Sequence, residues 1–248
     1  MSKDTKIALV TNATEYGGPA SVQALTREGF IVYCQDPKFS EDGFRDTFLA
    51  RFPQTVLIEK VEPETVVQAV IDRYGRIDTL VSNDCGNIAQ KELSANDFRE
   101  ALEVLTVTPY RYCAAVIPVM KQGGGGSIIL ITSGGPLLNP VASRDGNVSI
   151  HYQTARHAAH GLVHCFAQMV GQDNIQINAI APFMFYSQTY FSSEQGENDP
   201  AFIDLLERRV PMRRFGNESE FGELVAMLGG GRSKFVSGQV IAFSGGGA

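Results

Sequence analysis

The sequence predicts one α/β domain over residues 1–248: a Rossmann-like, doubly wound parallel sheet of about seven strands flanked by helices. Short apolar runs alternate with segments of helical periodicity along the whole chain, as in parallel sheets covered by helices. The first run leads through a glycine-containing turn into a helix, as at the entrance of dinucleotide-binding folds. The chain is 44% apolar without a shift in composition that marks a second domain, so one large core is expected.

The strands are expected where apolar and β-branched residues run together between turn signals. The run before Ser133 has five successive apolar or β-branched residues, which indicates a parallel strand that is buried on both faces of the sheet. The strands fall at residues 6–11, 30–35, 55–58, 78–82, 128–133, 175–181 and 239–243.

Between these strands, apolar residues recur every three to four positions, as on the inward side of an amphipathic helix. Gly29 ends the first of these segments, and a run of four glycines at residues 123–126 follows the longest one. Because that run precedes a strand and not a helix, we interpret it as a loop and not as a phosphate cradle. The helices are expected at residues 19–28, 41–51, 64–74, 95–120, 150–170 and 218–228.

Charge and composition exclude several classes of partner. The formal net charge is -6 and the pI is near 5.3, without a basic run or a basic amphipathic helix, so no nucleic-acid or membrane partner is expected. No apolar stretch is long enough for a signal peptide or a membrane span, which predicts a cytoplasmic protein. The four cysteines are far apart and lack CxxC spacing, as expected of buried thiols in a reducing compartment.

Three residues between positions 128 and 156 form a candidate catalytic group. A buried strand would deliver Ser133 to its carboxyl end, and Tyr152 and Arg156, four residues apart, would share one face of the following helix. A permanent positive charge beside a phenol favours the phenolate, which can act as a general base, and Ser133 would orient the substrate oxygen. A tyrosine and an arginine four residues apart are more often two solvent-exposed neighbours on a helix. The catalytic interpretation therefore depends on the rest of the chain.

The order of strands and helices, with Ser133 followed by Tyr152, resembles the short-chain dehydrogenase/reductase superfamily over essentially the full length. Val81-Ser82-Asn83 stands where that superfamily has Asn-Asn-Ala-Gly, and Ser237-Gly238-Gln239 matches its closing strand. The resemblance implies the same fold. Asp36 follows the second strand, where such folds often bind a ribose hydroxyl, but without the cofactor glycines we interpret it as a surface or capping acid.

Four departures from that superfamily indicate that this chain binds no nicotinamide cofactor. In the first turn, two of the three glycines that let the backbone approach a pyrophosphate are Asn12 and Tyr16. Arg156 replaces the lysine that contacts the nicotinamide ribose, and Leu105 replaces the asparagine of the proton relay. After the sixth strand, an apolar and aromatic segment replaces the residues that bind the carboxamide.

Together these features resemble the halohydrin dehalogenases, a cofactor-independent branch of the superfamily. The resemblance implies that vicinal halohydrins are converted to epoxides with release of halide and a proton. Tyr152 would remove the hydroxyl proton, Arg156 would assist it and Ser133 would donate to the same oxygen. The reverse reaction would open epoxides with halide, azide, cyanide or nitrite. The family also implies a homotetramer.

The resemblance places the halide at consecutive backbone amides of a turn, which can form an anion site. The expected donors are the amides of Met184 and Phe185, and aromatic edges of Tyr16 and Tyr190 would close the pocket. The halide and substrate residues are therefore Tyr16, Pro182, Phe183, Met184, Phe185 and Tyr190. The alternative is that the aromatic loop only packs on the core or on a neighbouring subunit; its residues are Phe183, Phe185, Tyr186, Tyr190 and Phe191.

Other interpretations stay open. The chain could be an NAD(P)-dependent oxidoreductase with an altered cofactor turn, or a non-catalytic member that binds a small ligand. His157, His160 and His164 share a helix side, but no carboxylate or cysteine completes a ligand set, so packing or subunit contact is favoured over a metal. Asp84 is interpreted as structural.

The gap between Ser133 and Tyr152 is longer than the dozen or so residues usual in the superfamily, which indicates an inserted loop at residues 139–149. This loop would either reshape the substrate entrance or bring Ser143 or Ser149 near the reacting oxygen. We prefer Ser133 because a strand fixes it. The natural substrate, its size, the enantioselectivity and the halide preference do not follow from the sequence.

Overall fold

The computed structural model describes residues 5–85, 94–137, 149–187 and 199–247. Its sheet has seven parallel strands in the order β3-β2-β1-β4-β5-β6-β7. This confirms the predicted Rossmann-like fold class. The strands are β1 Ile7–Val10, β2 Ile31–Gln35, β3 Val56–Ile58, β4 Thr79–Ser82, β5 Gly126–Ile131, β6 Ile175–Pro182 and β7 Val240–Phe243.

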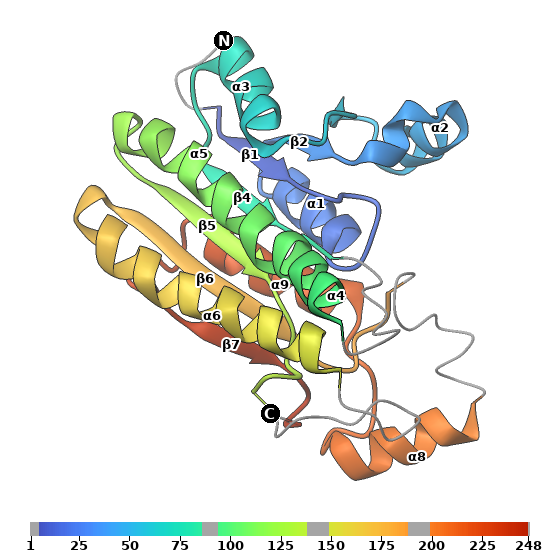
Figure 1. The fold of residues 1–248 in the computed structure, drawn as a ribbon. Helices are drawn as coiled ribbons and strands as arrows, with labels where there is room; N and C mark the ends of the chain where they lie inside the picture. Colours follow the sequence, from blue (N-terminus) through green and yellow to red (C-terminus); the bar gives the residue numbers. More distant parts are fainter. Residues whose placement is uncertain (1–4, 86–93, 138–148, 188–198, 248) are drawn as a thin grey trace.

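Helices cover both faces of the sheet, as Figure 1 shows, with α3, α5 and α6 on one face and α1 and α9 on the other. The α-helices are α1 Gly18–Arg27, α2 Asp42–Arg51, α3 Pro63–Tyr74, α4 Ala95–Leu102, α5 Thr108–Gln122, α6 Ile150–Val170, α8 Pro200–Arg209 and α9 Glu218–Gly229. Short 3₁₀ turns lie at η1 Pro37–Ser40 and η3 Gly171–Asp173.

The core consists of two apolar layers, one on each face of the sheet. Alternate residues of β1 enter opposite layers: Ala8 and Val10 pack with α1 and α9, whereas Ile7 and Leu9 pack with α3, α5 and α6. All four residues are fully buried. This two-sided burial is the reason why the strand reads as a continuous apolar run in the sequence.

Two features differ from the sequence prediction. The helix expected at residues 95–120 is divided into α4 and α5 by a π-helical segment, η2 Glu103–Val107. Helix α8 was not predicted, and it lies apart from the two helix layers (Figure 1).

The carboxyl ends of β1, β4, β5 and β6 meet at one edge of the sheet, and the residues that follow these strands lie side by side there. Open parallel sheets bind their ligands at this edge. Within the described residues, no helix is long and apolar enough to span a membrane.

Candidate active site

Ser133 lies two residues beyond the end of β5 and is 8% exposed. Backbone bonds to β6 continue past the end of the strand: Thr132 N donates to Ile180 O at 2.8 Å, and Gly134 N donates to Pro182 O at 2.7 Å. The Gly135 amide donates to the Ser133 hydroxyl oxygen at 3.1 Å. Because Oγ accepts this bond, its own proton can point toward a substrate oxygen.

Tyr152 and Arg156 share one face of α6, as predicted. The guanidinium carbon of Arg156 lies 5.3 Å from the centre of the Tyr152 ring. Tyr152 is half-buried and packs against an apolar cluster that contains Ala101 and Leu105. Leu105, at the position where the superfamily's reductases have an asparagine, is fully buried and apolar and provides no proton relay.

Arg156 is 1% exposed, and it connects α6 to two strands. Its Nη1 donates to the main-chain oxygens of Asp84 and Ile131, both at 3.2 Å. Ile131 is two residues before Ser133, so the guanidinium joins the helix that carries Tyr152 to the strand that carries Ser133.

Asp84, which the sequence analysis interpreted as structural, is a buried acid beside this group. Its carboxylate accepts hydrogen bonds from the Thr11 hydroxyl and the side-chain amide of Asn12, each at 3.3 Å, and from the Ser82 hydroxyl. Burial raises the pKa of Asp84 to about 6, and the charge of Arg156 acts in the opposite direction. Its place directly after a predicted strand end was the sequence signal for a site residue.

Five backbone amides of the first turn, residues 12–18, donate hydrogen bonds within the protein. Asn12 N donates to Gln35 Oε1 at 3.2 Å, and Thr14 N donates to Asp36 Oδ2 at 3.0 Å. The amides of Ala13, Glu15 and Gly18 donate to backbone oxygens. A reductase would present amides of this turn to the cofactor pyrophosphate.

Asp36 caps the start of η1, because its carboxylate accepts a hydrogen bond from Lys38 N. The same carboxylate also accepts bonds from the amide and the hydroxyl of Thr14. The expectation of a capping acid is therefore confirmed. The expectation of a surface acid is wrong, because Asp36 is 2% exposed.

The predicted halide loop, residues 182–185, begins at the end of β6. Met184 has a left-handed backbone with a φ of 53°. Phe183 N donates to Phe243 O, but within the described residues the amides of Met184 and Phe185 donate to no backbone oxygen. Consecutive amides beside a left-handed residue form the concave turn that binds anions in other proteins.

The aromatic side chains around this loop are mostly buried. Phe185 is 1% exposed; its ring is stacked on Phe221 at 4.9 Å and meets the edge of Tyr16 at 5.9 Å. The Tyr16 hydroxyl donates to the main-chain oxygen of Thr132 at 3.5 Å. The rings of Phe185 and Tyr16 therefore pack in the core; for Phe185 this agrees with the alternative interpretation. The amides of the loop remain the candidate anion donors. Tyr190 lies outside the described residues.

The inserted loop also lies outside the described residues, except for Ser149, which is the N-cap residue of α6. Ser143 is not among the described residues. No group of three or more His, Cys, Asp or Glu side chains in the described ranges is arranged to hold a metal ion.

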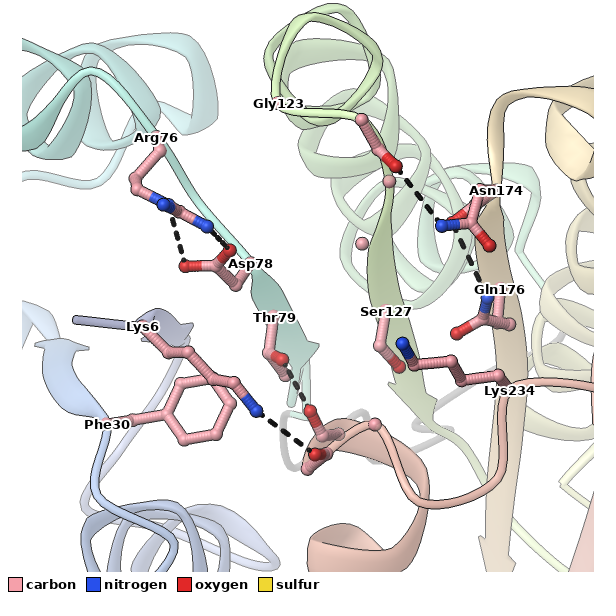
Figure 2. A pocket seen from close by; sticks show the side chains of 16 residues that line it. Lys6, Phe30, Arg76, Asp78, Thr79, Gly123, Ser127, Asn174, Gln176 and Lys234 are labelled. Carbon is pink, nitrogen blue, oxygen red and sulfur yellow. Dashed lines mark hydrogen bonds and ion pairs between the residues drawn. The ribbon is translucent and has the colours of Figure 1, made fainter. Parts of the chain in front are cut away.

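A cavity of about 460 Å³ lies at the opposite edge of the sheet, at the amino ends of the strands (Figure 2). Two of its polar side chains donate hydrogen bonds to the last main-chain oxygens of α9: Ser127 Oγ to Leu228 O at 3.0 Å, and Thr79 Oγ1 to Gly229 O at 2.8 Å. The glycines at positions 123–126 line this cavity; the first three form a loop between α5 and β5, as predicted, and Gly126 begins β5. Far from Ser133 and Tyr152, it is not part of the candidate active site.

Comparisons with known proteins give two kinds of relative. Two solved structures superpose on the chain with a TM-score of 0.90. One, a dehalogenation enzyme, is 29% identical and covers 100% of both chains. The other, a halohydrin dehalogenase bound to ethyl (2S)-oxiran-2-ylacetate, is 30% identical over 97% of this chain and 96% of its own. A curated relative, the 7alpha-hydroxysteroid dehydrogenase of Clostridium sardiniense, is 29% identical over 97% of this chain and 92% of its own length.

The family model described as enoyl-(acyl carrier protein) reductase matches residues 19–247, which is most of the chain. This match agrees with the seven-stranded parallel sheet and with the order of Ser133 and Tyr152 along it. The chain therefore belongs to the short-chain dehydrogenase/reductase family.

Proposed function

We propose that this chain is a halohydrin dehalogenase, a cofactor-independent lyase that converts vicinal halohydrins to epoxides. One combination carries the proposal: Ser133, Tyr152 and Arg156 accompany a first turn in which five backbone amides already donate within the protein. The structural similarity to a halohydrin dehalogenase that holds an epoxide supports this assignment.

In the proposed reaction, the hydroxyl group of the substrate binds between Ser133 and Tyr152. Tyr152 removes the hydroxyl proton, the buried charge of Arg156 favours its phenolate form, and Ser133 donates to the developing alkoxide. The alkoxide oxygen attacks the neighbouring carbon, so a carbon–oxygen bond forms as the carbon–halogen bond breaks. The products are an epoxide, a halide ion and a proton, and no hydride is transferred.

The halide leaves toward the amides of Met184 and Phe185. Both residues follow closely after the end of β6 and are buried, and the neighbouring rings exclude water from the anion. With the same geometry, a bound halide, azide, cyanide or nitrite attacks an epoxide in the reverse direction. We expect this enzyme to act as a cytoplasmic homotetramer, like the family that it resembles.

The second candidate is an NAD(P)-dependent oxidoreductase, which the identity to the 7alpha-hydroxysteroid dehydrogenase favours. It requires a nucleotide to displace the bonds that the first turn makes to Gln35 and Asp36. Titration with NADH and NADPH, followed by cofactor fluorescence, tests this candidate. Tight binding would support the oxidoreductase and contradict the dehalogenase proposal.

The direct test is to incubate the purified protein with a short vicinal bromoalcohol, without nicotinamide, and to follow the release of bromide and acid. We expect release by the native protein and a loss of at least about 10³-fold in Tyr152→Phe, because phenylalanine cannot take the proton. Circular dichroism of the variant controls for folding. Full activity of a folded Tyr152→Phe variant would exclude the proposed base.

A further inference from the structure

His160 is a buried histidine next to the proposed catalytic group. It lies on α6 one turn beyond Arg156, on the same face of the helix, and is 7% exposed. Its Nε2 lies 3.0 Å from the hydroxyl oxygen of Thr132, the residue directly before Ser133. The ring also interacts with the backbone of Ser133. The reaction proposed above gives this histidine no role.

The surroundings of Thr132 define the direction of the hydrogen bond. The Thr132 hydroxyl has one proton, and it donates that proton to Ile180 O at 3.3 Å. With that proton on Ile180 O, we expect the Thr132 oxygen to accept the bond from His160 and the imidazole proton to be on Nε2. Burial lowers the pKa of His160 to about 4, which keeps the ring neutral at physiological pH.

The end of β5 is thus attached to α6 at two successive helical turns. Arg156 donates to the main-chain oxygen of Ile131, and His160 Nε2 shares a hydrogen bond with the Thr132 hydroxyl. The main-chain oxygen of Thr132 also accepts the Tyr16 hydroxyl beside the predicted halide loop. The position of Thr132 therefore affects both Ser133 and the aromatic wall next to the halide amides.

We propose that His160 is a positioning residue, which acts through Thr132 to hold the Ser133 hydroxyl at the correct distance from a substrate oxygen bound at Tyr152. This inference rests on the proposed dehalogenase function and adds a residue to it. The simpler alternative is that the His160–Thr132 bond only stabilises the fold. The two alternatives differ in what happens when both partners are replaced together.

Four variants separate them: Thr132→Val, Thr132→Ser, His160→Leu, and the double variant Thr132→Val with His160→Leu. Thr132→Val leaves the His160 N–H buried without its acceptor, so both stability and kcat should fall. Removing both polar partners should restore much of the stability, because no buried donor then lacks a partner. The position of Ser133 is not restored in that way, because no hydrogen bond joins residues 132 and 160 in the double variant.

The measurements are urea unfolding, and kcat and KM for halide release from a short vicinal bromoalcohol. We expect kcat to fall ~10- to 100-fold in Thr132→Val and to stay low in the double variant, with KM changed less than about threefold. Thr132→Ser, which keeps the hydroxyl, should retain most of kcat. A double variant whose kcat returns to the native value together with its stability would overturn the inference.

A second readout does not depend on activity. Nitrogen-15 NMR of the native protein should show His160 as the neutral tautomer protonated at Nε2, and a ring protonated at Nδ1 would overturn the inference. By contrast, a native protein that has the expected tautomer but releases no halide from any halohydrin would contradict the proposed function, and with it the catalytic role of this contact. The two failures are therefore distinguishable.

Discussion

Arg156 donates from Nη1 to the main-chain oxygen of Asp84, 3.2 Å away, and this bond joins the helix of the candidate base to the end of β4. The same nitrogen reaches Ile131 O on β5. A guanidinium that is 1% exposed thus fixes three elements at the carboxyl edge of the sheet and also lies over the Tyr152 ring. The same guanidinium both holds these elements together and lies next to the candidate base. Two substitutions are therefore needed to separate its effect on stability from its effect on activity.

The first prediction therefore compares Arg156→Met with Arg156→Lys. Methionine fills similar space but leaves the oxygens of Asp84 and Ile131 without their donor, which should cost about 2–4 kcal/mol of unfolding free energy and abolish halide release. Lysine keeps the charge but not the planar fork, so we expect a smaller loss of stability and a roughly 10-fold lower kcat. Urea unfolding and bromide release measure the two effects. Equal activity in the two variants would mean that the charge has no role.

The second prediction concerns the pH dependence of stability at Asp84. Because its folded pKa is raised from 3.8 to about 6, the folded state binds the proton more tightly than the unfolded state. The favourable contribution is therefore complete below about pH 4 and is lost as the pH rises through 6, by about 3 kcal/mol. Asp84→Asn cannot ionise, so the stability of the variant relative to the native protein should increase from pH 4 to pH 8. Thermal unfolding across this range is the measurement, and an unchanged difference would exclude a raised pKa.

The third prediction concerns Tyr16, which contributes a ring edge to Phe185 and a hydroxyl bond to Thr132. Tyr16→Phe keeps the ring and loses one long hydrogen bond, so the inhibition of the reaction by bromide should change less than about threefold. Tyr16→Ala removes the ring and opens the anion site to water, so the inhibition constant for bromide should rise about 10-fold or more. If the alanine variant bound bromide as tightly as the native protein, the ring would have no part in the halide site.

Most of the sheet was predictable, and the physical reason is its burial. The strand expected at residues 175–181 is β6 Ile175–Pro182, whose residues are all buried, and six of its eight side chains are apolar. The α6 helix also matches its expected range, residues 150–170. The positions of Ser133, Tyr152 and Arg156 in the fold could be predicted because each lies on or beside such an element.

The errors occurred where structure depends on contacts distant in sequence. Nothing local distinguishes the π-helical residues 103–107 from an α-helix, since one extra residue in the turn leaves the apolar pattern intact. Asp36, which was expected at the surface, is buried, and its carboxylate accepts bonds from Thr14, 22 residues away along the chain. The α8 helix has a local signal in the sequence: Asp199 can cap the helix, and Pro200 is favoured at its first position.

The last prediction uses two neighbouring glycines after Ser133. A Cβ at Gly134 would lie 2.9 Å from the Cβ of Phe183 and 3.2 Å from the oxygen of Ala181, so Gly134→Ala must displace the predicted halide loop. A Cβ at Gly135 would meet only the end of the Gln153 side chain, at 2.8 Å, and that flexible amide can move away. Gly135→Ala is thus the matched control for an added methyl group.

We expect Gly134→Ala to raise the bromide inhibition constant and the KM for epoxide opening by azide, each by about 10-fold or more, and Gly135→Ala to change them much less. Gly134→Ala should also unfold at a lower urea concentration than Gly135→Ala, because displacing the loop costs about 1–3 kcal/mol, and circular dichroism controls for the folding of both variants. The measurement is azide-dependent epoxide opening with bromide as the competitor. Equal effects of the two methyl groups would argue against an anion site at Met184 and Phe185, because only the methyl group at Gly134 presses on the loop that carries these amides.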